Sequence, residues 1–149
     1  MFLEAEELKT VAYGYQLAEI TEDDDDILEL SIDAAVEEMK SYLRPTKNSQ
    51  VQIDVEAIFS ATGTARNPLI LELCKSIALY YICRLSNVDI IEQKVKDRYD
   101  RAIEWLKRVS DSTGSGSDNI NPGLPTLPPV DDNTGLPFRF GSRNKFNHE

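Results

Sequence analysis

The residues best suited to chemistry are the consecutive acids of the run TEDDDD at residues 21–26. Carboxylates bind hard cations such as Ca²⁺, but calcium loops space their ligands and include a glycine for the sharp turn. This run has neither the spacing nor the glycine. It matches a helix start better, because Thr21 and Asp24 fit a capping box and the acids complement the positive end of the helix dipole. We therefore expect a helix terminus here and no metal site.

The other reactive side chains do not form a catalytic arrangement. His148 is the only histidine and lies one residue from the end of the sequence, where a Ser/His/Asp or Cys/His site would lack support. The chain has no cluster of cysteine and histidine residues that could bind zinc. Gly114 and Gly116 lack the GK[ST] of a phosphate-binding loop. The sequence therefore predicts neither an enzyme nor a cofactor.

The two cysteines, Cys74 and Cys83, fall in one apolar segment, nine residues apart. On a helix this spacing places them on opposite faces and ~13 Å apart along the axis, which is too far for a disulfide. We expect both to be small core residues with free thiols, which fits synthesis in the cytoplasm.

The charge of the chain is strongly acidic and unevenly distributed. The net charge is -10, and residues 1–60 hold 15 acidic and 4 basic side chains. Such a protein would be repelled by nucleic-acid phosphates unless one face were strongly basic. The charge of the chain therefore disfavours a function in recognising nucleic acid.

No segment of the sequence is typical of a membrane span or a signal peptide. The most apolar run, residues 69–85, is interrupted by Glu72, Lys75 and Arg84 and is short for a bilayer, which needs ~20 apolar residues. The N-terminal residues lack a basic region followed by an apolar one. We therefore expect no membrane partner.

The spacing of apolar residues predicts a mainly α fold, a small antiparallel bundle of about four helices. The helices are expected at residues 4–12, 24–43, 68–85 and 90–109. Gly14 is the expected stop of the first, and Asp89 with Glu92 is the expected cap of the fourth. The third helix should begin at Asn67 and Pro68, a good N-cap and first residue. It is apolar nearly all round, so it should be the central, buried element.

The sequence divides into a helical domain at residues 1–110 and a tail at residues 111–149 rich in Gly, Ser and Pro. Within the domain, residues 44–67 form a long connection that we interpret as a protruding loop. Its residues 50–55 alternate between apolar and polar, which favours a short strand or extended arm, while residues 54–60 could instead form a helical turn.

Two predicted helices carry charged faces of opposite sign. The acidic ladder consists of Glu29, Asp33 and Glu37. The basic stripe on the last helix consists of Lys94, Arg98, Arg101 and Arg108, with Trp105 beside them. An Arg/Trp surface could stack bases, or it could simply be a solvated face. The two faces could also pair within the chain or between subunits, and the second case would favour a ring of identical copies.

The tail contains a flexible linker, a Pro-rich segment NPGLPTLPPV and a terminal segment FRFGSRNKF. Its composition is that of a disordered segment. A tail of this length should not pack on its own small domain, so we expect another protein to hold it. Aromatic and arginine side chains are common interface hot spots. The predicted docking residues are therefore Phe138, Arg139, Phe140, Arg143, Lys145 and Phe146.

Several stretches of the domain are similar to a known family. These are FLEAEELKTVAYGYQLAEIT, DAAVEEMKSYL, NPLILELCKSIALYYICRL and VKDRYDRAIEWLKRVS, of which the apolar third stretch followed by RYDRAIEWLK is the most specific. Together they resemble the small Mu-like prophage structural protein family, and the resemblance extends over residues 2–110. That family resembles in turn the helical head-completion adaptors of tailed phages. The long connection at residues 44–67 and the extended tail depart from the usual pattern.

The resemblance implies a head-tail connector of the phage neck, made in the host cytoplasm and located in the virion. It implies a homo-oligomeric ring, of about twelve copies, docked on the portal protein and extending the DNA channel. DNA would then be passing cargo, for which an acidic channel surface is suitable. Glu29, Asp33, Glu37, Arg98, Arg101 and Trp105 are the candidates for subunit contacts. The alternative is a monomeric adaptor or regulatory protein that recruits a partner through its Pro-rich tail.

Overall fold

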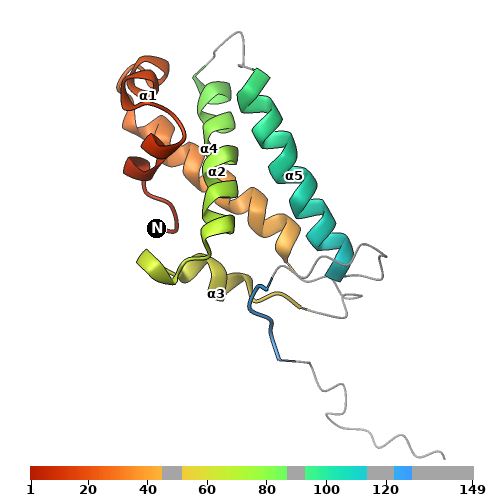
Figure 1. The fold of residues 1–149 in the computed structure, drawn as a ribbon. Coiled ribbons are helices and arrows are strands. Elements are labelled where there is room, and N and C mark those ends of the chain that lie inside the picture. The colour runs from red at the N-terminus through yellow and green to blue at the C-terminus, as the bar shows by residue number, and fades with distance from the viewer. Residues whose placement is uncertain (45–51, 87–92, 114–122, 129–149) are drawn as a thin grey trace, which may run out of the picture.

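The computed structural model describes residues 1–44, 52–86, 93–113 and 123–128 of the chain (Figure 1). In order, the elements are the 3₁₀ helix η1 (Ala5–Thr10), the helices α1 (Gly14–Thr21), α2 (Asp25–Leu43) and α3 (Val55–Ser60), the 3₁₀ turn η2 (Gly63–Ala65), and the helices α4 (Pro68–Leu85) and α5 (Gln93–Thr113). The predicted mainly α class is confirmed. Within the described residues the long helices α2, α4 and α5 form the body of the fold.

Helix α4 is the centre of the packing, as its sequence predicts. Asn67 caps it, since its side-chain oxygen accepts hydrogen bonds from the amides of Leu69 (2.9 Å) and Ile70 (3.2 Å), and Pro68 is its first residue. The helix packs against α2, α5, α1 and η1. Both cysteines lie buried in it, and burial raises the pKa of the Cys74 thiol to about 12.

The junction between α1 and α2 differs from the predicted capping box. Helix α1 continues through Thr21, whose buried hydroxyl donates to the Leu17 carbonyl at 2.9 Å. Thr21 is therefore the end of one helix and cannot cap the next. Asp24 alone caps α2, accepting from the Asp26 amide at 3.0 Å. Gly14, the predicted stop of the first helix, is instead the first residue of α1.

The N-terminal segment is fastened to the domain by apolar and ionic contacts. Leu3 and Leu8 are fully buried, and the Phe2 ring meets the Phe59 ring edge-on at 4.9 Å. The Arg66 guanidinium makes a two-point ion pair with the Glu7 carboxylate, at 2.6 and 2.8 Å. It also donates to the Phe2 carbonyl at 2.7 Å. These contacts join η1 to the segment that leads into α4.

The interpretation of residues 44–67 as a protruding loop is wrong for its described part, residues 52–67. This part contains α3, which confirms the alternative of a helical turn at residues 54–60, and η2. It packs against α2. Its apolar side chains are buried in the core: Ile53, Val55, Ile58 and Phe59. Asp54 caps α3 by accepting from the Ala57 amide at 2.9 Å. The segment is ordered because it supplies one end of the hydrophobic core.

The expectation that the tail does not pack on its own domain is wrong for residues 123–128. Thr126 forms an antiparallel bridge with Ile53. The Asp54 amide donates to the Pro125 carbonyl at 2.9 Å, and the Leu127 amide donates to the Gln52 carbonyl at 2.8 Å. Leu124 enters the hydrophobic core. Part of the Pro-rich segment NPGLPTLPPV is thus an extended piece of this fold.

Replacement of Leu124 by Ala tests this packing. Leu124 is 9% exposed, while Leu127, three residues later, is 38% exposed. We expect Leu124→Ala to lower the free energy of unfolding by ~1–2 kcal/mol, which is less than a deep core deletion because Leu124 lies at the edge of the core. Leu127→Ala should change it by less than half as much. Urea unfolding of both variants measures the difference. Equal losses of unfolding free energy in the two variants would contradict the burial of Leu124 in the core.

Candidate functional site

The basic stripe lies on the exposed face of α5. Val95, Ala102, Ile103, Leu106 and Val109 face the core, so Lys94, Arg98, Arg101 and Arg108 point away from it and are exposed. Trp105 is half-buried and packs against the core beside them. The Arg98 guanidinium donates to the Val11 carbonyl at 3.4 Å, at the edge of hydrogen-bond range.

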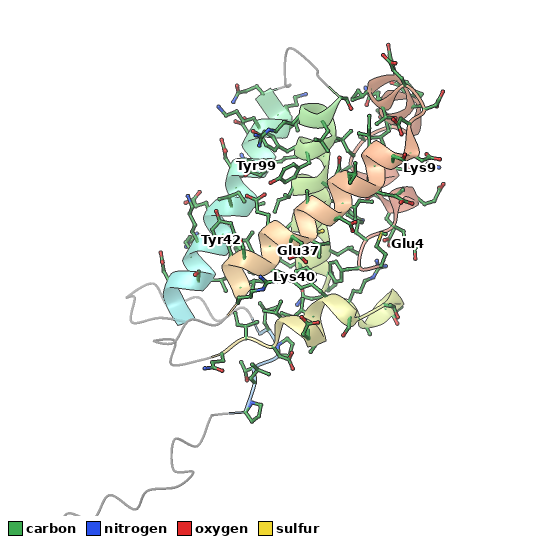
Figure 2. The ribbon with its side chains drawn as sticks, turned by 180° about the vertical axis from the view of Figure 1, so that it is seen from behind. Glu4, Lys9, Glu37, Lys40, Tyr42 and Tyr99 are labelled. Atoms are coloured by element: carbon green, nitrogen blue, oxygen red, sulfur yellow. The ribbon has the colours of Figure 1, made fainter. Side chains whose placement is uncertain are left out.

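The acidic ladder lies on the exposed face of α2. Glu37 accepts from Lys40 of the same helix at 3.0 Å (Figure 2). It also accepts from Arg44, the C-cap of that helix, at 3.3 Å. The Lys40 hydrogen bond is the main reason that the pKa of Glu37 is lowered. Glu29 and Asp33 are exposed, and neither makes an ion pair with another described residue.

The ladder and the stripe do not pair with each other. No ion pair joins α2 to α5 in the part of the chain that the structure describes. Instead these helices meet through the Tyr99 hydroxyl, which donates to Glu38 Oε1 at 2.9 Å. Pairing of the two faces within one chain is thus not observed among these residues.

The Tyr99–Glu38 contact belongs to a cluster that the sequence reasoning missed. The Tyr99 ring stacks on the Tyr80 ring at 4.0 Å, and Tyr81 meets Tyr80 edge-on. Burial, followed by the hydrogen bond to Glu38, raises the pKa of Tyr99. Glu38 Oε2 is shielded from solvent, and no donor among the described residues meets it within hydrogen-bond distance and angle. The one clue to this cluster in the sequence is the position of Glu38 on α2. It directly precedes Met39, which is buried. The cluster fixes α2 against α4 and α5.

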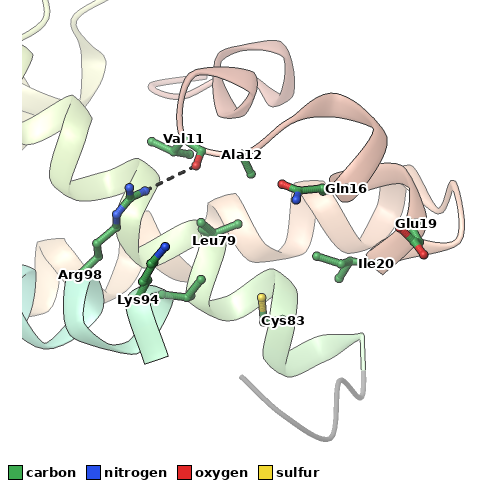
Figure 3. Close-up of a pocket in the computed structure, with 10 residues that line it drawn as sticks. Val11, Ala12, Gln16, Glu19, Ile20, Leu79, Cys83, Lys94 and Arg98 are labelled. Atoms are coloured by element: carbon green, nitrogen blue, oxygen red, sulfur yellow. Dashed lines mark hydrogen bonds between the residues drawn. The ribbon is translucent and has the colours of Figure 1, made fainter. Parts of the chain in front are cut away.

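A groove opens between α1, α4 and α5 (Figure 3). Its volume is about 340 Å³, at the small end of the ~300–1,000 Å³ range of ligand pockets. Its lining comprises Val11, Ala12, Gln16, Glu19, Ile20, Leu79, Cys83, Lys94, Val95 and Arg98. Most of these side chains are apolar, and the two cations lie together on α5. We call this surface the α1–α5 groove.

Two aromatic side chains lie beside the α1–α5 groove. Tyr13 and Tyr15 are both exposed, and their rings stack at 5.6 Å. Tyr13 shares a smaller hollow with Val11, Ala12 and Gln16, which also line the groove. Exposed aromatic residues next to an apolar groove are typical of protein interfaces.

The acids of residues 21–26 do not gather into a metal site. No group of three or more His, Cys, Asp or Glu side chains within the described residues could hold a metal ion. Glu22 and Asp23 follow the end of α1, Asp24 caps α2, and Asp25 and Asp26 are the first residues of α2. All five side chains are exposed to solvent. Among the described helices, none is both long and apolar enough to cross a membrane.

The docking residues predicted for the tail lie outside the described residues. These are Phe138, Arg139, Phe140, Arg143, Lys145 and Phe146, and the same holds for His148 and for the predicted cap of Asp89 and Glu92. Helix α5 continues to Thr113, past the expected domain end at Ser110.

Comparison with models of known protein families gives a match over most of the chain. The family model described as Bacteriophage Mu, Gp36 matches residues 3–117. The matched region begins before η1 and ends just after α5, so it includes all the helices that the structure describes. No curated protein and no solved structure is significantly similar to the chain.

Proposed function

The chain belongs to the Bacteriophage Mu Gp36 family, and from this premise we propose that it is a head-tail connector of the phage neck. Membership in a phage family supports a structural protein of the virion. The finer role is a head-completion adaptor that forms a ring on the portal protein and extends the DNA channel. It is synthesised in the host cytoplasm and acts in the neck of the particle.

One observation carries this proposal beyond the family. The exposed acids Glu29 and Asp33 on α2 and the exposed Arg101 on α5 find no ion-pair partner among the described residues of their own chain. Oppositely charged faces on one molecule attract neighbouring copies, and a head-to-tail contact closes into a ring when the rotation between copies allows it.

The overall charge fits a protein that surrounds DNA without binding it. With a net charge of -10, an acidic channel wall would repel phosphates and let the duplex slide. In this role the protein is not an enzyme and needs no cofactor. The terminal segment FRFGSRNKF, with its aromatic and basic side chains, would dock on the portal or on a neighbouring neck protein.

The alternative is a monomeric adaptor that recruits a partner through the Pro-rich tail. Pro125 and Leu127 already exchange backbone hydrogen bonds with Asp54 and Gln52. A domain that reads an extended Pro-rich peptide would have to detach this segment from the fold, which favours the connector.

Mixing the purified full-length chain with portal particles of the same phage tests the proposal. We expect the chain to co-sediment with the portal and to add a ring of density in electron micrographs. A variant with Phe138, Phe140 and Phe146 replaced by Ala should keep its helical content but co-sediment less. A wild-type chain that stays in the supernatant and adds no density would contradict the connector role.

A further inference from the structure

A single leucine is exposed in the middle of the acidic face of α2. Leu30 is 61% exposed, the largest exposed fraction of any leucine among the described residues. Asp26 and Asp33 lie one turn before and after it on the same face, and Glu29 precedes it. All three acids are exposed. We call these four residues the Leu30 knob.

The Leu30 knob and the α1–α5 groove are complementary in chemistry. The knob is an apolar side chain surrounded by carboxylates, and the groove is an apolar hollow with Lys94 and Arg98 at one end. Glu19, the one acid in the lining, lies at the other end of the groove in Figure 3. Buried apolar contact would supply affinity, and matching of the acids with the α5 cations would set the orientation.

The two surfaces lie on opposite sides of the molecule. The groove is lined by α4, α5, α1 and the turn before α1, and by no residue of α2. In Figure 1 α4 lies in front of α2, and in Figure 2, seen from behind, α2 lies in front. A chain therefore cannot place its own knob in its own groove.

We propose that the α1–α5 groove receives the Leu30 knob of a second copy of this chain. The contact is heterologous, with different surfaces on the two partners, so an open chain of copies keeps a free knob at one end and a free groove at the other until a ring closes. The exposed Tyr13–Tyr15 stack beside the groove extends the contact area. This inference rests on the proposed function, because it names the contact by which a ring would form.

Two variants, each defective in one half of the contact, test the proposal with the full-length chain. Leu30→Asp disables the knob, and Lys94→Glu with Arg98→Glu reverses the charge of the groove. All three side chains are exposed, so the helices should remain intact. We expect each variant alone to self-associate at least tenfold more weakly than the wild type in sedimentation velocity, with or without portal particles.

Mixing the two variants gives the distinguishing result. The knob variant keeps a functional groove and the groove variant keeps a functional knob, so an equimolar mixture should form a 1:1 dimer and stop there. An unfolded variant could not give this dimer. The matched controls are Leu69→Asp, at a leucine 48% exposed on α4, and Lys96→Glu with Lys107→Glu on the other exposed flank of α5. Both controls should assemble like the wild type.

The possible failures separate this inference from the proposed function. If the wild type assembles and both variants assemble equally well, the knob-and-groove contact is overturned while the connector role stands. If the groove variant loses only portal binding and keeps self-association, the groove belongs to a different protein and the inference is also overturned. If the wild type does not self-associate even on portal particles, both proposals are wrong.

Discussion

Reversal of Arg98 and Arg101 to Glu should lower self-association at least tenfold. Both side chains are exposed on one face of α5, where they would meet the acidic ladder of a neighbouring copy. The double change removes two attractive charges and adds two repulsive ones, and like charges placed together at an interface cost several kcal/mol. Analytical ultracentrifugation of the full-length chain, alone and with portal particles, measures the change in mass.

Lys96→Glu with Lys107→Glu is the matched control for this prediction. These lysines are exposed on the same helix but on its opposite flank, and the change in net charge is the same. Adding Glu29→Lys and Asp33→Lys to the Arg98/Arg101 variant should restore assembly, because the attraction is then reversed at both partners. An unchanged oligomer mass in the Arg98/Arg101 variant would contradict the role of the basic stripe.

Replacement of Arg66 by Ala should destabilise the domain by ~2–3 kcal/mol. The Arg66 side chain is 13% exposed and its partner Glu7 is 25% exposed, so the substitution leaves a largely shielded carboxylate unpaired. It also removes hydrogen bonds to the carbonyls of Phe2 and Gly63. The full cost of breaking a buried pair is ~3–5 kcal/mol, and the remaining solvent access lowers it.

Arg44→Ala is the matched control, since Arg44 pairs with Glu37 at 3.3 Å on the open surface. An exposed pair contributes only ~0–1 kcal/mol, so this variant should unfold at nearly the wild-type urea concentration. Equal effects of Arg66→Ala and Arg44→Ala on urea unfolding would contradict the inference that the Glu7–Arg66 pair stabilises the attachment of η1 to the domain.

The same pair predicts a loss of stability in acid. The hydrogen bond from Arg66 is the main reason that the pKa of Glu7 falls from 4.5 to about 2. A carboxylate whose pKa is lower in the folded state stabilises the fold above pH 4.5, and this contribution is lost as the pH falls from 4.5 towards 2. Between pH 5 and pH 2.5 the unfolding free energy of the wild type should fall more than that of Glu7→Gln, which lacks the titrating group. Parallel pH profiles would contradict this assignment.

The features predictable from the sequence were those set by neighbouring residues. Helix α4 begins at Pro68, as predicted from the adjacent Asn67 cap and from its apolar surface. Helix α2 runs from Asp25 to Leu43, within one residue of the prediction. In both helices the deciding signals lie within one or two turns of the residues they affect.

The features that the sequence reasoning missed depend on partners far along the chain. Ile53 pairs with Thr126, and no local pattern in either segment identifies the other. The same limit applies to Tyr99 and Glu38, which meet across the α2–α5 contact. Local pattern does indicate a helical turn at residues 54–60 as an alternative, but nothing local shows that the apolar side chains of this segment complete the core, so the sequence alone favours a protruding loop.

The candidate site was predictable in composition but not in geometry. The sequence identifies the acidic ladder and the basic stripe by helical spacing alone. It does not show that Glu37 is already paired with Lys40 and Arg44. Nor does it reveal the α1–α5 groove, because the groove's lining comes from three separate parts of the chain.

Cryo-electron microscopy of the full-length chain assembled on portal particles tests the central claim most directly. We expect a closed ring in which the acidic face of α2 of each copy faces α5 of the next. Isolated copies bound to the portal without touching one another, or a ring joined through surfaces that exclude both α2 and α5, would contradict it.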